Sequence, residues 1–539
     1  MSVDFNQSMF SYYKACTAHN PATDKVWQFW GASTTRAKFI RDVENFAGYL
    51  MSLGVGKGDN VVLCLSNIPN ALVCFYAINR AGAIANLVHP VIPSEKLQAM
   101  DEEMSPKAYV LFDEFFYKYK DWIEATGKPI ILCSAQDYLP MAFKPFYNAY
   151  VAKKLSTDNS SNVVRYRDIG KYIAPTVAVD GEDMAVYMHS GGTCGKAKTV
   201  MMSNRALNNL TDNILDAIDH RYSNKDAMLM ALPIFHTYGL GVCLHSMICA
   251  GIRIILMPKF KADTACYLIK RYGVTFVAGV PYMYSKMLAS GKFKGKMLTK
   301  IRACYCGGDK VSENTKQLFK QAMEKIGNNI LLSEGYGLTE ACVCCINTMK
   351  VYKPNSIGRP VKSMTFAIID EQGNFLPPKN KGEIVISGPT LMKGYYNSEG
   401  DREAFFEDDK HVKWLKSGDV GYIDEDGNVF FTDRIKRLVK ISGVNVFPQE
   451  IENVVDNLDC VKISCVVETT INGKSSTKLY VVKDTSTLLD NEQIIEIIRQ
   501  AIAQNFMRHS MPGIIEFIDE LPRTPIGKVD FLALQQMSR

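Results

Sequence analysis

The chain has 539 residues, of which 47% are hydrophobic and 22% are charged, as expected for a folded globular protein. A chain of this length exceeds what one hydrophobic core can organise, so we expect several lobes or domains. The formal charge of +6 is small for this length and no basic block accompanies it, which argues against a nucleic-acid partner.

The cysteine content and the first residues indicate the cellular compartment and the redox state of the thiols. Fifteen cysteines in so long a chain do not form the disulfide framework of a small secreted domain. Asp4 stands where a secretory signal needs a basic and then apolar start. We therefore expect a cytoplasmic protein with reduced thiols.

Two groups of cysteines are closely spaced, Cys304/Cys306 and Cys342/Cys344/Cys345. Their gaps do not fit the usual C-x-x-C metal site, and alternating cysteines in apolar runs are typical of buried strands. Burial in strands is our prediction, with a metal cluster as the alternative. The longest uncharged run, Tyr238–Ile252, is shorter than the ~18 apolar residues of a spanning helix. We expect no transmembrane segment, and peripheral contact with a membrane stays open.

The first two-thirds of the chain alternates strand and helix patterns. Apolar residues recur at helical spacing from Phe39 to Leu53, and Gly54 follows as a stop signal. The later strands are expected at 60–65, 227–232, 252–256, 274–280, 301–306 and 329–332. The later helices are expected at 71–84, 264–271 and 313–326. This alternation predicts an α/β fold with mostly parallel sheets.

The pattern changes near residue 365. Short strands are expected at 366–369, 383–386, 421–423 and 429–432, the last two joined across Asp426-Gly427. They indicate a small β-rich lobe. After Asp433, helices at 449–455 and 492–504 with strands at 461–467 and 479–482 predict a compact α+β unit.

A glycine-rich stretch, Ser190-Gly191-Gly192-Thr193-Cys194-Gly195-Lys196-Ala197-Lys198, follows an apolar run. Three glycines let backbone N–H groups converge on one point, as loops that bind phosphate require. The hydroxyls and the two lysines add donors and positive charge. The spacing is not that of a Walker loop, so a flexible surface loop with solvated lysines is the alternative.

Five further motifs follow in order: Leu232-Pro233-Ile234-Phe235-His236, Gly335-Tyr336-Gly337-Leu338-Thr339-Glu340, Ser417-Gly418-Asp419, Asp433-Arg434-Ile435-Lys436 with Lys440 and Gly443, and Pro522-Arg523-Thr524-Pro525-Ile526-Gly527-Lys528. Together with the glycine-rich stretch, they resemble the adenylate-forming superfamily, which contains acyl-CoA synthetases, adenylation domains and beetle luciferases. The chain departs from the family pattern at Cys194, Ala197, Thr199 and Asp309.

The resemblance implies a fold and a division of the chain. It implies a large multi-lobed N-terminal domain over residues 1–433, with the β-rich lobe at about 350–432. A smaller, mobile C-terminal domain over residues 434–539 would carry the catalytic lysine. Asp433 matches the position of the hinge between the two.

The resemblance also implies an AMP-forming acid–CoA ligase that uses ATP, Mg²⁺ and CoA. Lys528 would be the catalytic lysine, Thr339 an α-phosphate donor and Glu340 the Mg²⁺ carboxylate. The implied ATP/AMP-binding set is Ser190, Gly191, Gly192, Thr193, Cys194, Gly195, Lys198, Gly307, Gly308, Asp309, Gly335, Tyr336, Gly337, Thr339, Asp419 and Arg434. Lys440, Ser442 and Gly443 would line the CoA channel.

An acid pocket is expected from His236, Gly239, Leu240, Gly241, Tyr282, Gly307, Gly335, Leu338 and Cys342. The resemblance makes His236 a gate between acid and thiol, although a lone histidine in an apolar run is also typical of a core. A mostly apolar wall favours a fatty or aromatic acid.

Three functions are compatible with the sequence. The first is the ligase, with a carboxylic acid and CoA as small-molecule partners. The second is a stand-alone adenylating enzyme that loads the phosphopantetheine thiol of a carrier protein. The third is a nucleotide-binding sensor, which would not need the lysine at position 528. We favour the ligase, because Lys528 is present and no aspartate lies near His236 to pair with an α-amine.

Overall fold

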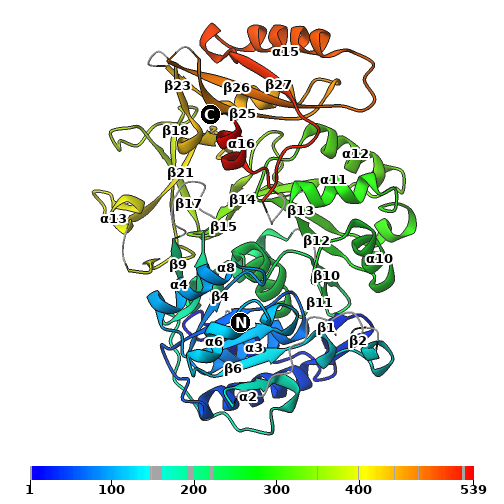
Figure 1. Cartoon of the computed structure of the whole chain (residues 1–539), viewed down its shortest axis with the longest axis vertical. Coiled ribbons are helices and arrows are strands. Elements are labelled where there is room, and N and C mark those ends of the chain that lie inside the picture. Colours follow the sequence, from blue (N-terminus) through cyan, green and yellow to red (C-terminus); the bar gives the residue numbers. More distant parts are fainter. Residues whose placement is uncertain are drawn as a thin grey trace.

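The computed structural model describes residues 3–145, 147, 161–190, 198–218, 222–348, 350–397, 400–441, 444–471, 473–524 and 528–538. It is a mixed α/β structure, which confirms the predicted fold class (Figure 1). The N-terminal segments lie at one end of the long axis and the C-terminal segments at the other.

The first large sheet has the strand order β19-β9-β8-β4-β3-β5-β6-β7. These strands are β3 (Asn60–Cys64), β4 (Ile84–Leu87), β5 (Ala108–Phe112), β6 (Ile130–Cys133), β7 (Val163–Arg165), β8 (Met184–His189), β9 (Thr199–Ser203) and β19 (Gly394–Tyr395). Strands β3 to β8 pair in parallel, whereas β9 and β19 run antiparallel at the edge.

The second sheet has the order β16-β15-β14-β13-β12-β10-β11-β1-β2. Its strands are β1 (Lys25–Phe29), β2 (Ala32–Thr35), β10 (Ala227–Met230), β11 (Arg253–Leu256), β12 (Phe276–Gly279), β13 (Ala303–Gly307), β14 (Leu332–Leu338), β15 (Cys342–Ile346) and β16 (Arg359–Pro360). Its centre is parallel, so the carboxyl ends of β12, β13 and β14 meet at one edge.

The helices follow the expected pattern of connections between strands. The main ones are α1 (Met9–Cys16), α2 (Arg36–Ser52), α3 (Pro69–Arg80), α4 (Ser94–Met104), α8 (Asn204–Ala217), α10 (Ala262–Tyr272), α11 (Pro281–Ala289) and α12 (Glu313–Glu324). The Thr35 hydroxyl caps α2 by accepting a hydrogen bond from the Lys38 N–H at 3.3 Å. Gly54 follows with φ +82°, so the predicted stop is confirmed.

Two predicted elements were wrong in their bounds. The apolar run 71–84 is not one helix, because Gly82 turns at φ +75° and Ile84 already begins β4. The strand expected at 329–332 begins at Leu332 and continues to Leu338. The glycines of Gly335-Tyr336-Gly337 resemble a turn signal, yet β13 and β15 hold them in a sheet.

The closely spaced cysteines are buried strand residues, as predicted. Cys304 and Cys306 lie on β13, and Cys342, Cys344 and Cys345 on β15. Burial raises the pKa of the Cys342 thiol to about 12. Among the described residues, no helix is both long enough and apolar enough to cross a bilayer.

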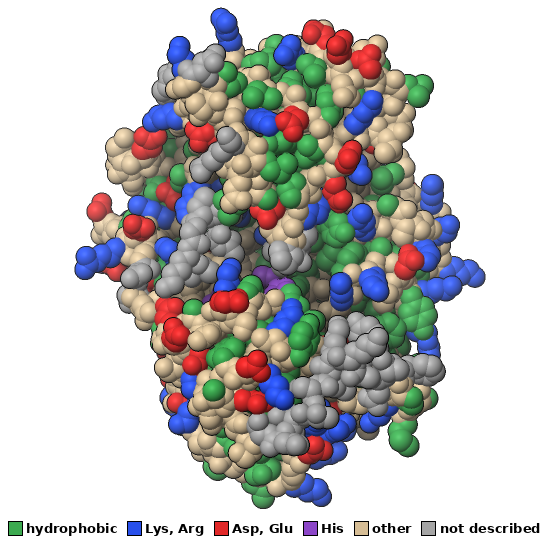
Figure 2. All heavy atoms as spheres, in the orientation of Figure 1, with side chains coloured by type: hydrophobic (Ala, Val, Ile, Leu, Met, Phe, Trp, Pro, Cys, Tyr) green, Lys and Arg blue, Asp and Glu red, His purple; other side chains and the backbone are tan. Residues whose placement is uncertain are grey.

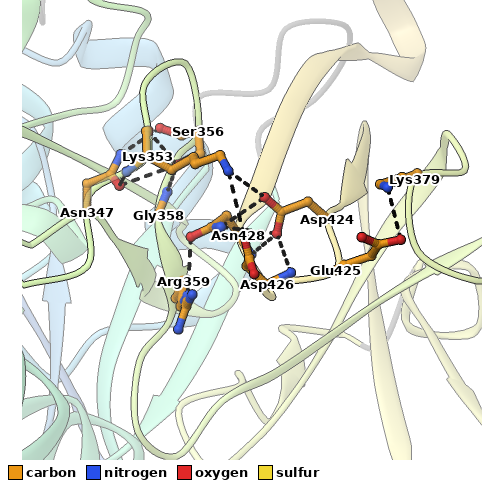
Figure 3. Close-up of polar contacts among 10 residues, drawn as sticks. All are labelled: Asn347, Lys353, Ser356, Gly358, Arg359, Lys379, Asp424, Glu425, Asp426 and Asn428. Carbon is orange, nitrogen blue, oxygen red and sulfur yellow. Dashed lines mark hydrogen bonds and ion pairs between the residues drawn. The ribbon is translucent and has the colours of Figure 1, made fainter.

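The β-rich lobe contains β17 (Thr365–Ile369), β18 (Gly382–Ser387), β20 (Phe405–Glu407), β21 (Lys413–Ile423) and β22 (Val429–Arg434), together with α13 (Asp401–Ala404) nearby. The hairpin predicted across Asp426-Gly427 is confirmed (Figure 3). Asp424 accepts from the N–H groups of Asp426 and Asn428, and Asn428 accepts from Arg359 at 3.2 Å. The hairpin that follows from this turn, with a register shift between Val420 and Gly421, sets Asp419 opposite Arg434.

The C-terminal segment has hydrophobic clusters of its own, made only of residues from 439 onward. Its elements are β23 (Val439–Ile441), β24 (Val444–Val446), α14 (Pro448–Val455), β25 (Val461–Ile471), β26 (Lys474–Lys483), α15 (Asn491–Asn505), β27 (Ile514–Phe517) and α16 (Phe531–Met537). The predicted α+β character is confirmed.

Candidate active site

A continuous cavity of about 3690 Å³ opens where the sheets and the C-terminal segment meet. Figure 2 shows this face of the molecule hollowed near its middle, with histidine at the bottom of the hollow. Such a volume exceeds that of an ordinary single-ligand pocket and leaves room for more than one small molecule.

The cavity brings together most of the residues singled out from the sequence. Those that line it are Ser190, Lys198, His236, Gly239, Tyr282, Gly307, Gly308, Asp309, Gly335, Tyr336, Gly337, Leu338, Thr339, Glu340, Cys342, Asp419, Arg434 and Lys528. Residues 191–197, with the expected Gly191, Gly192, Thr193, Cys194 and Gly195, lie outside the described residues, as do Ser442 and Gly443.

Leu240 and Gly241, which we assigned to the acid pocket from the sequence, are not among the residues that line this cavity. Both lie in the helical segment Tyr238–Ser246 and are buried. A Cβ on Gly241 would stand 2.3 Å from Leu210 Cδ2, so this glycine permits close packing on α8. Similarly, a Cβ on Gly239 would meet the Pro233 carbonyl oxygen at 1.9 Å, although Gly239 itself lines the cavity.

Asp419 and Arg434 form one polar group, supplied by neighbouring strands. Arg434 Nε lies 3.6 Å from Asp419 Oδ1. The Tyr336 hydroxyl donates to Asp419 Oδ2 at 2.6 Å, a contact that the sequence did not reveal. Burial raises the pKa of Asp419, while Arg434 and the Tyr336 hydroxyl oppose that shift. The arrangement presents a carboxylate and a guanidinium at the same edge of the cavity.

Lys528 extends from the C-terminal segment to the carboxyl end of β13. Its Cε and Nζ lie 3.4 and 3.7 Å from where a Cβ on Gly308 would stand. Gly308 has φ +84°, so a side chain there would strain the backbone as well as crowd the lysine. Burial and the charge of Arg434 lower the pKa of Lys528, whereas Asp309 and Asp419 oppose the shift. The Lys528 amine therefore lines the cavity beside Gly308, close to the end of β13.

His236 is half-buried on the cavity wall, directly after Phe235. Burial lowers its pKa to about 4, with Lys528 and His89 adding to the shift. The imidazole is therefore neutral at pH 7, and its role is steric or hydrogen-bonding rather than ionic. The neighbouring Phe235 ring also stacks edge-on against His89, at a centroid distance of 4.7 Å.

Glu340 lies in the turn between β14 and β15 and faces the cavity. Its carboxylate accepts a hydrogen bond from the Tyr395 hydroxyl at 3.1 Å. Burial raises its pKa, and no described lysine or arginine lies within ion-pair distance of it. Arg434 opposes this shift through its charge, but Glu340 makes no ion pair with the described residues. A buried carboxylate of this kind fits a hard cation such as Mg²⁺, which prefers oxygen ligands.

His189 is a further site residue that sequence reasoning missed. It precedes Ser190, and its Nε2 donates to Asn86 Oδ1 at 2.7 Å while its Nδ1 accepts from the Thr199 hydroxyl at 3.0 Å. The Ser190 N–H donates to the Lys198 carbonyl oxygen at 2.9 Å. These contacts hold together the two described ends of the glycine-rich stretch. His189 stands between an apolar run and a glycine-rich run, so no periodic pattern in the sequence marked it as a site residue.

Asp433, the expected hinge residue, is fully buried near the end of β22. Its carboxylate accepts hydrogen bonds from the N–H groups of Arg434 and Gln449, at 2.8 and 2.7 Å. Gln449 lies in the first turn of α14, so one side chain links the β-rich lobe to the C-terminal segment. Lys440 is exposed on β23, outside the cavity lining.

A pH dependence of stability follows from the burial of Asp433, which raises its pKa to about 6. The folded state then binds this proton more tightly than the unfolded chain does. The protonated Asp433 carboxyl therefore contributes its full stabilisation of the folded state below the unfolded pKa of ~3.9. This contribution is lost as the pH rises through 6. We expect Asp433→Asn to gain stability relative to wild type between pH 4 and 6, with a constant difference above. Urea unfolding of both proteins measures it, and a difference independent of pH would contradict it.

Comparison with known proteins agrees with this geometry. The family model described as AMP-binding enzyme matches residues 15–396. The chain belongs to the AMP-binding enzyme family. It is 29% identical over 516 residues to a long-chain-fatty-acid–CoA ligase of Bacillus subtilis, covering 93% of this chain and 89% of that one. It is also 29% identical over 504 residues to a probable 4-coumarate–CoA ligase 3 of Dictyostelium discoideum, covering 91% and 88%.

Solved structures share the fold over 98% of this chain. ATP-bound MatB from Rhodopseudomonas palustris superposes with a TM-score of 0.83 at 24% identity, covering 98% of each chain. A benzoate CoA ligase from Burkholderia xenovorans superposes with a TM-score of 0.81 at 21% identity, covering 98% of this chain and 99% of that one.

Proposed function

We propose that this AMP-binding enzyme is an AMP-forming carboxylic acid–CoA ligase. It would activate a fatty or aromatic acid with ATP to give acyl-AMP and pyrophosphate, and then transfer the acyl group to CoA. The observation that supports this most is the position of Lys528, which reaches from the C-terminal segment into a cavity lined by the residues of the AMP-binding motifs.

Lys528 can offset the charge repulsion between the two substrates in the first half-reaction. A carboxylate must attack the α-phosphorus of a polyphosphate, and two like charges ~4 Å apart repel by about 4 kcal/mol at an effective dielectric near 20. A cation between them offsets this repulsion in the transition state. Asp419 and Arg434, which also line the cavity, suit the ribose hydroxyls.

The apolar part of the cavity supports a fatty or aromatic acid. The cavity lining includes aliphatic, methionine and aromatic side chains: Ile214, Ala217, Ile218, Ala231, Leu232, Val242, Met257, Phe260, Val280, Tyr282, Met283 and Leu338. Burial of an alkyl chain or ring against such a wall is favourable, at about 0.8 kcal/mol for each buried CH₂. A short polar acid gains much less there.

Mg²⁺ and CoA complete the proposal. Glu340 is the residue that would hold Mg²⁺, which would neutralise charge on the phosphates when bound. CoA would reach the acyl group after the C-terminal domain, residues 434–539, turns about Asp433 relative to residues 1–433. A few residues that absorb the change in φ and ψ are sufficient for such a turn.

A panel of carboxylic acids tests the proposal. Purified protein with ATP and Mg²⁺ is given acetate, a medium-chain acid, a long-chain acid or an aromatic acid, with and without CoA. We expect pyrophosphate and AMP with the fatty or aromatic acids, and acyl-CoA only when CoA is present. Pyrophosphate release is followed by a coupled assay and the thioester by mass spectrometry.

Each alternative has its own outcome in the same panel. If pyrophosphate is released but CoA never accepts the acyl group, the ligase assignment fails, and a carrier-protein phosphopantetheine thiol becomes the acceptor to test. If no acid causes pyrophosphate release although ATP binds, a nucleotide sensor is favoured. A preference for acetate would contradict the assignment of the apolar wall to the acid.

A further inference from the structure

The segment around Tyr395 joins two parts of the active site that are far apart in sequence. The Met392 N–H donates to the Glu340 carbonyl oxygen at 2.7 Å. On the other side, Tyr396 donates its N–H to the Thr199 carbonyl oxygen at 2.8 Å, and Tyr395 pairs with Val200 in the β19–β9 ladder. The backbone of this segment is therefore fixed against both the Glu340 turn and the strand that follows Lys198.

The Tyr395 side chain uses this position to contact two charged residues of opposite sign. Its hydroxyl donates to Glu340 Oε1 at 3.1 Å. The Lys198 ammonium makes a cation–π contact with the Tyr395 ring, with Nζ 4.5 Å from the ring centroid. The residue is only 8% exposed, and its own N–H donates to Asp401 Oδ1 at 2.7 Å. The Tyr395 side chain is thus fixed both at its backbone and at its hydroxyl.

The lysine position also depends on a glycine. A Cβ on Gly400 would stand 2.3 Å from Lys198 Nζ, so a side chain there would displace the ammonium. Lys198, Glu340 and Tyr395 all line the cavity. Although a lysine and a glutamate face the same space, no ion pair joins them within the described residues. The Tyr395 ring contacts the lysine, and the Tyr395 hydroxyl contacts the glutamate.

We propose that Tyr395 is a positioning residue that keeps Lys198 and Glu340 apart and ready for the ligand. A direct Lys198–Glu340 pair would neutralise both groups before nucleotide arrives. The ring instead attracts the ammonium through its π face, and the hydroxyl orients the carboxylate. Lys198 then remains available to a phosphate oxygen and Glu340 to a divalent cation. The inference rests on the proposed function, because it assumes that ATP occupies this part of the cavity.

Two substitutions separate the two contacts of Tyr395. Tyr395→Phe keeps the ring and removes the hydroxyl, whereas Tyr395→Leu removes both. Binding of ATP to the full-length protein is measured by calorimetry, first with EDTA and then across a Mg²⁺ titration, without acid or CoA. With EDTA, we expect Tyr395→Phe to bind within about twofold of wild type and Tyr395→Leu to bind about tenfold more weakly. Both should need about three to ten times more Mg²⁺ to reach full affinity.

A double-mutant cycle distinguishes positioning from a general loss of structure. Lys198→Gln should weaken ATP binding, and adding Tyr395→Leu to it should cause no further loss with EDTA, since both changes remove one interaction. Independent, additive losses would overturn the inference. The matched control is Tyr396→Phe, whose side chain packs on Tyr187 at a centroid distance of 5.6 Å and should bind ATP as wild type does.

The outcomes also separate this inference from the proposed function. If wild type binds ATP with Mg²⁺ but Tyr395→Phe and Tyr395→Leu match it, or are equally impaired with EDTA, the role of Tyr395 is overturned and the ligase assignment stands. If wild type binds no ATP at all, the proposed function fails and the positioning role fails with it.

Discussion

Lys528→Ala should lower the rate of acyl-adenylate formation by about a thousandfold, because removal of the cation restores a repulsion of about 4 kcal/mol between carboxylate and polyphosphate. Thioester formation from supplied acyl-adenylate should be largely spared, since that step brings no second anion to the phosphorus. Single-turnover assays with ATP and acid, and separately with acyl-adenylate and CoA, measure the two half-reactions.

Lys474→Ala is the control for this prediction. Lys474 is an exposed lysine at the start of β26 in the same C-terminal segment, and its removal should leave both half-reactions unchanged. Equal loss of both half-reactions in Lys528→Ala would contradict the assignment of Lys528 to adenylation alone. A loss much smaller than a hundredfold would mean that another cation, such as Arg434, carries the main electrostatic effect.

Locking the C-terminal segment in its present position should stop thioester formation but allow adenylation. Lys381 Nζ pairs with Glu450 Oε1 at 2.5 Å, and the Lys310 ammonium donates to Asn453 Oδ1, so α14 is held against the rest of the molecule by side chains near its exposed face. In this arrangement Lys528 already lies beside Gly308. We expect it to be the arrangement for adenylation.

A cleavable bis-maleimide that joins Lys381→Cys to Glu450→Cys creates this lock. With ATP, Mg²⁺, acid and CoA all present, the cross-linked protein should release about one equivalent of pyrophosphate and then stall, because the acyl group cannot pass to CoA. Reductive cleavage of the cross-link should restore acyl-CoA synthesis. The two single-cysteine variants treated with the same reagent are the controls. Full turnover by the locked protein would show that no domain rotation is needed.

The fold was predictable where local signals agree with the tertiary structure. Helix α2 has an apolar stripe, a threonine cap and a glycine stop, and its prediction was correct within three residues at each end. The strand β14 was harder, because Gly335 and Gly337 favour a turn in isolation. Only pairing with β13 and β15 makes them part of a sheet, and such pairing is not visible in local sequence.

The candidate site was predictable where it consists of contiguous motifs. Asp419, Arg434 and Lys528 belong to motifs that the sequence shows, and the structure brings them to one cavity. Tyr395 was missed, because the strand that holds it has two residues and pairs with a strand almost two hundred positions earlier. Leu240 and Gly241 lie outside the cavity lining, and an apolar, glycine-containing segment does not reveal in sequence which of its faces meets the cavity.

Oxygen transfer from the acid to AMP tests the central claim most directly. If a carboxylate oxygen attacks the α-phosphorus and the thiol of CoA then attacks the acyl carbon, the bond that breaks leaves that oxygen on AMP. With an acid labelled in both carboxylate oxygens by ¹⁸O, mass spectrometry should find one heavy oxygen in each AMP, one in the acyl-CoA and none in pyrophosphate. Unlabelled AMP, or heavy oxygen in inorganic phosphate together with ADP, would contradict the account.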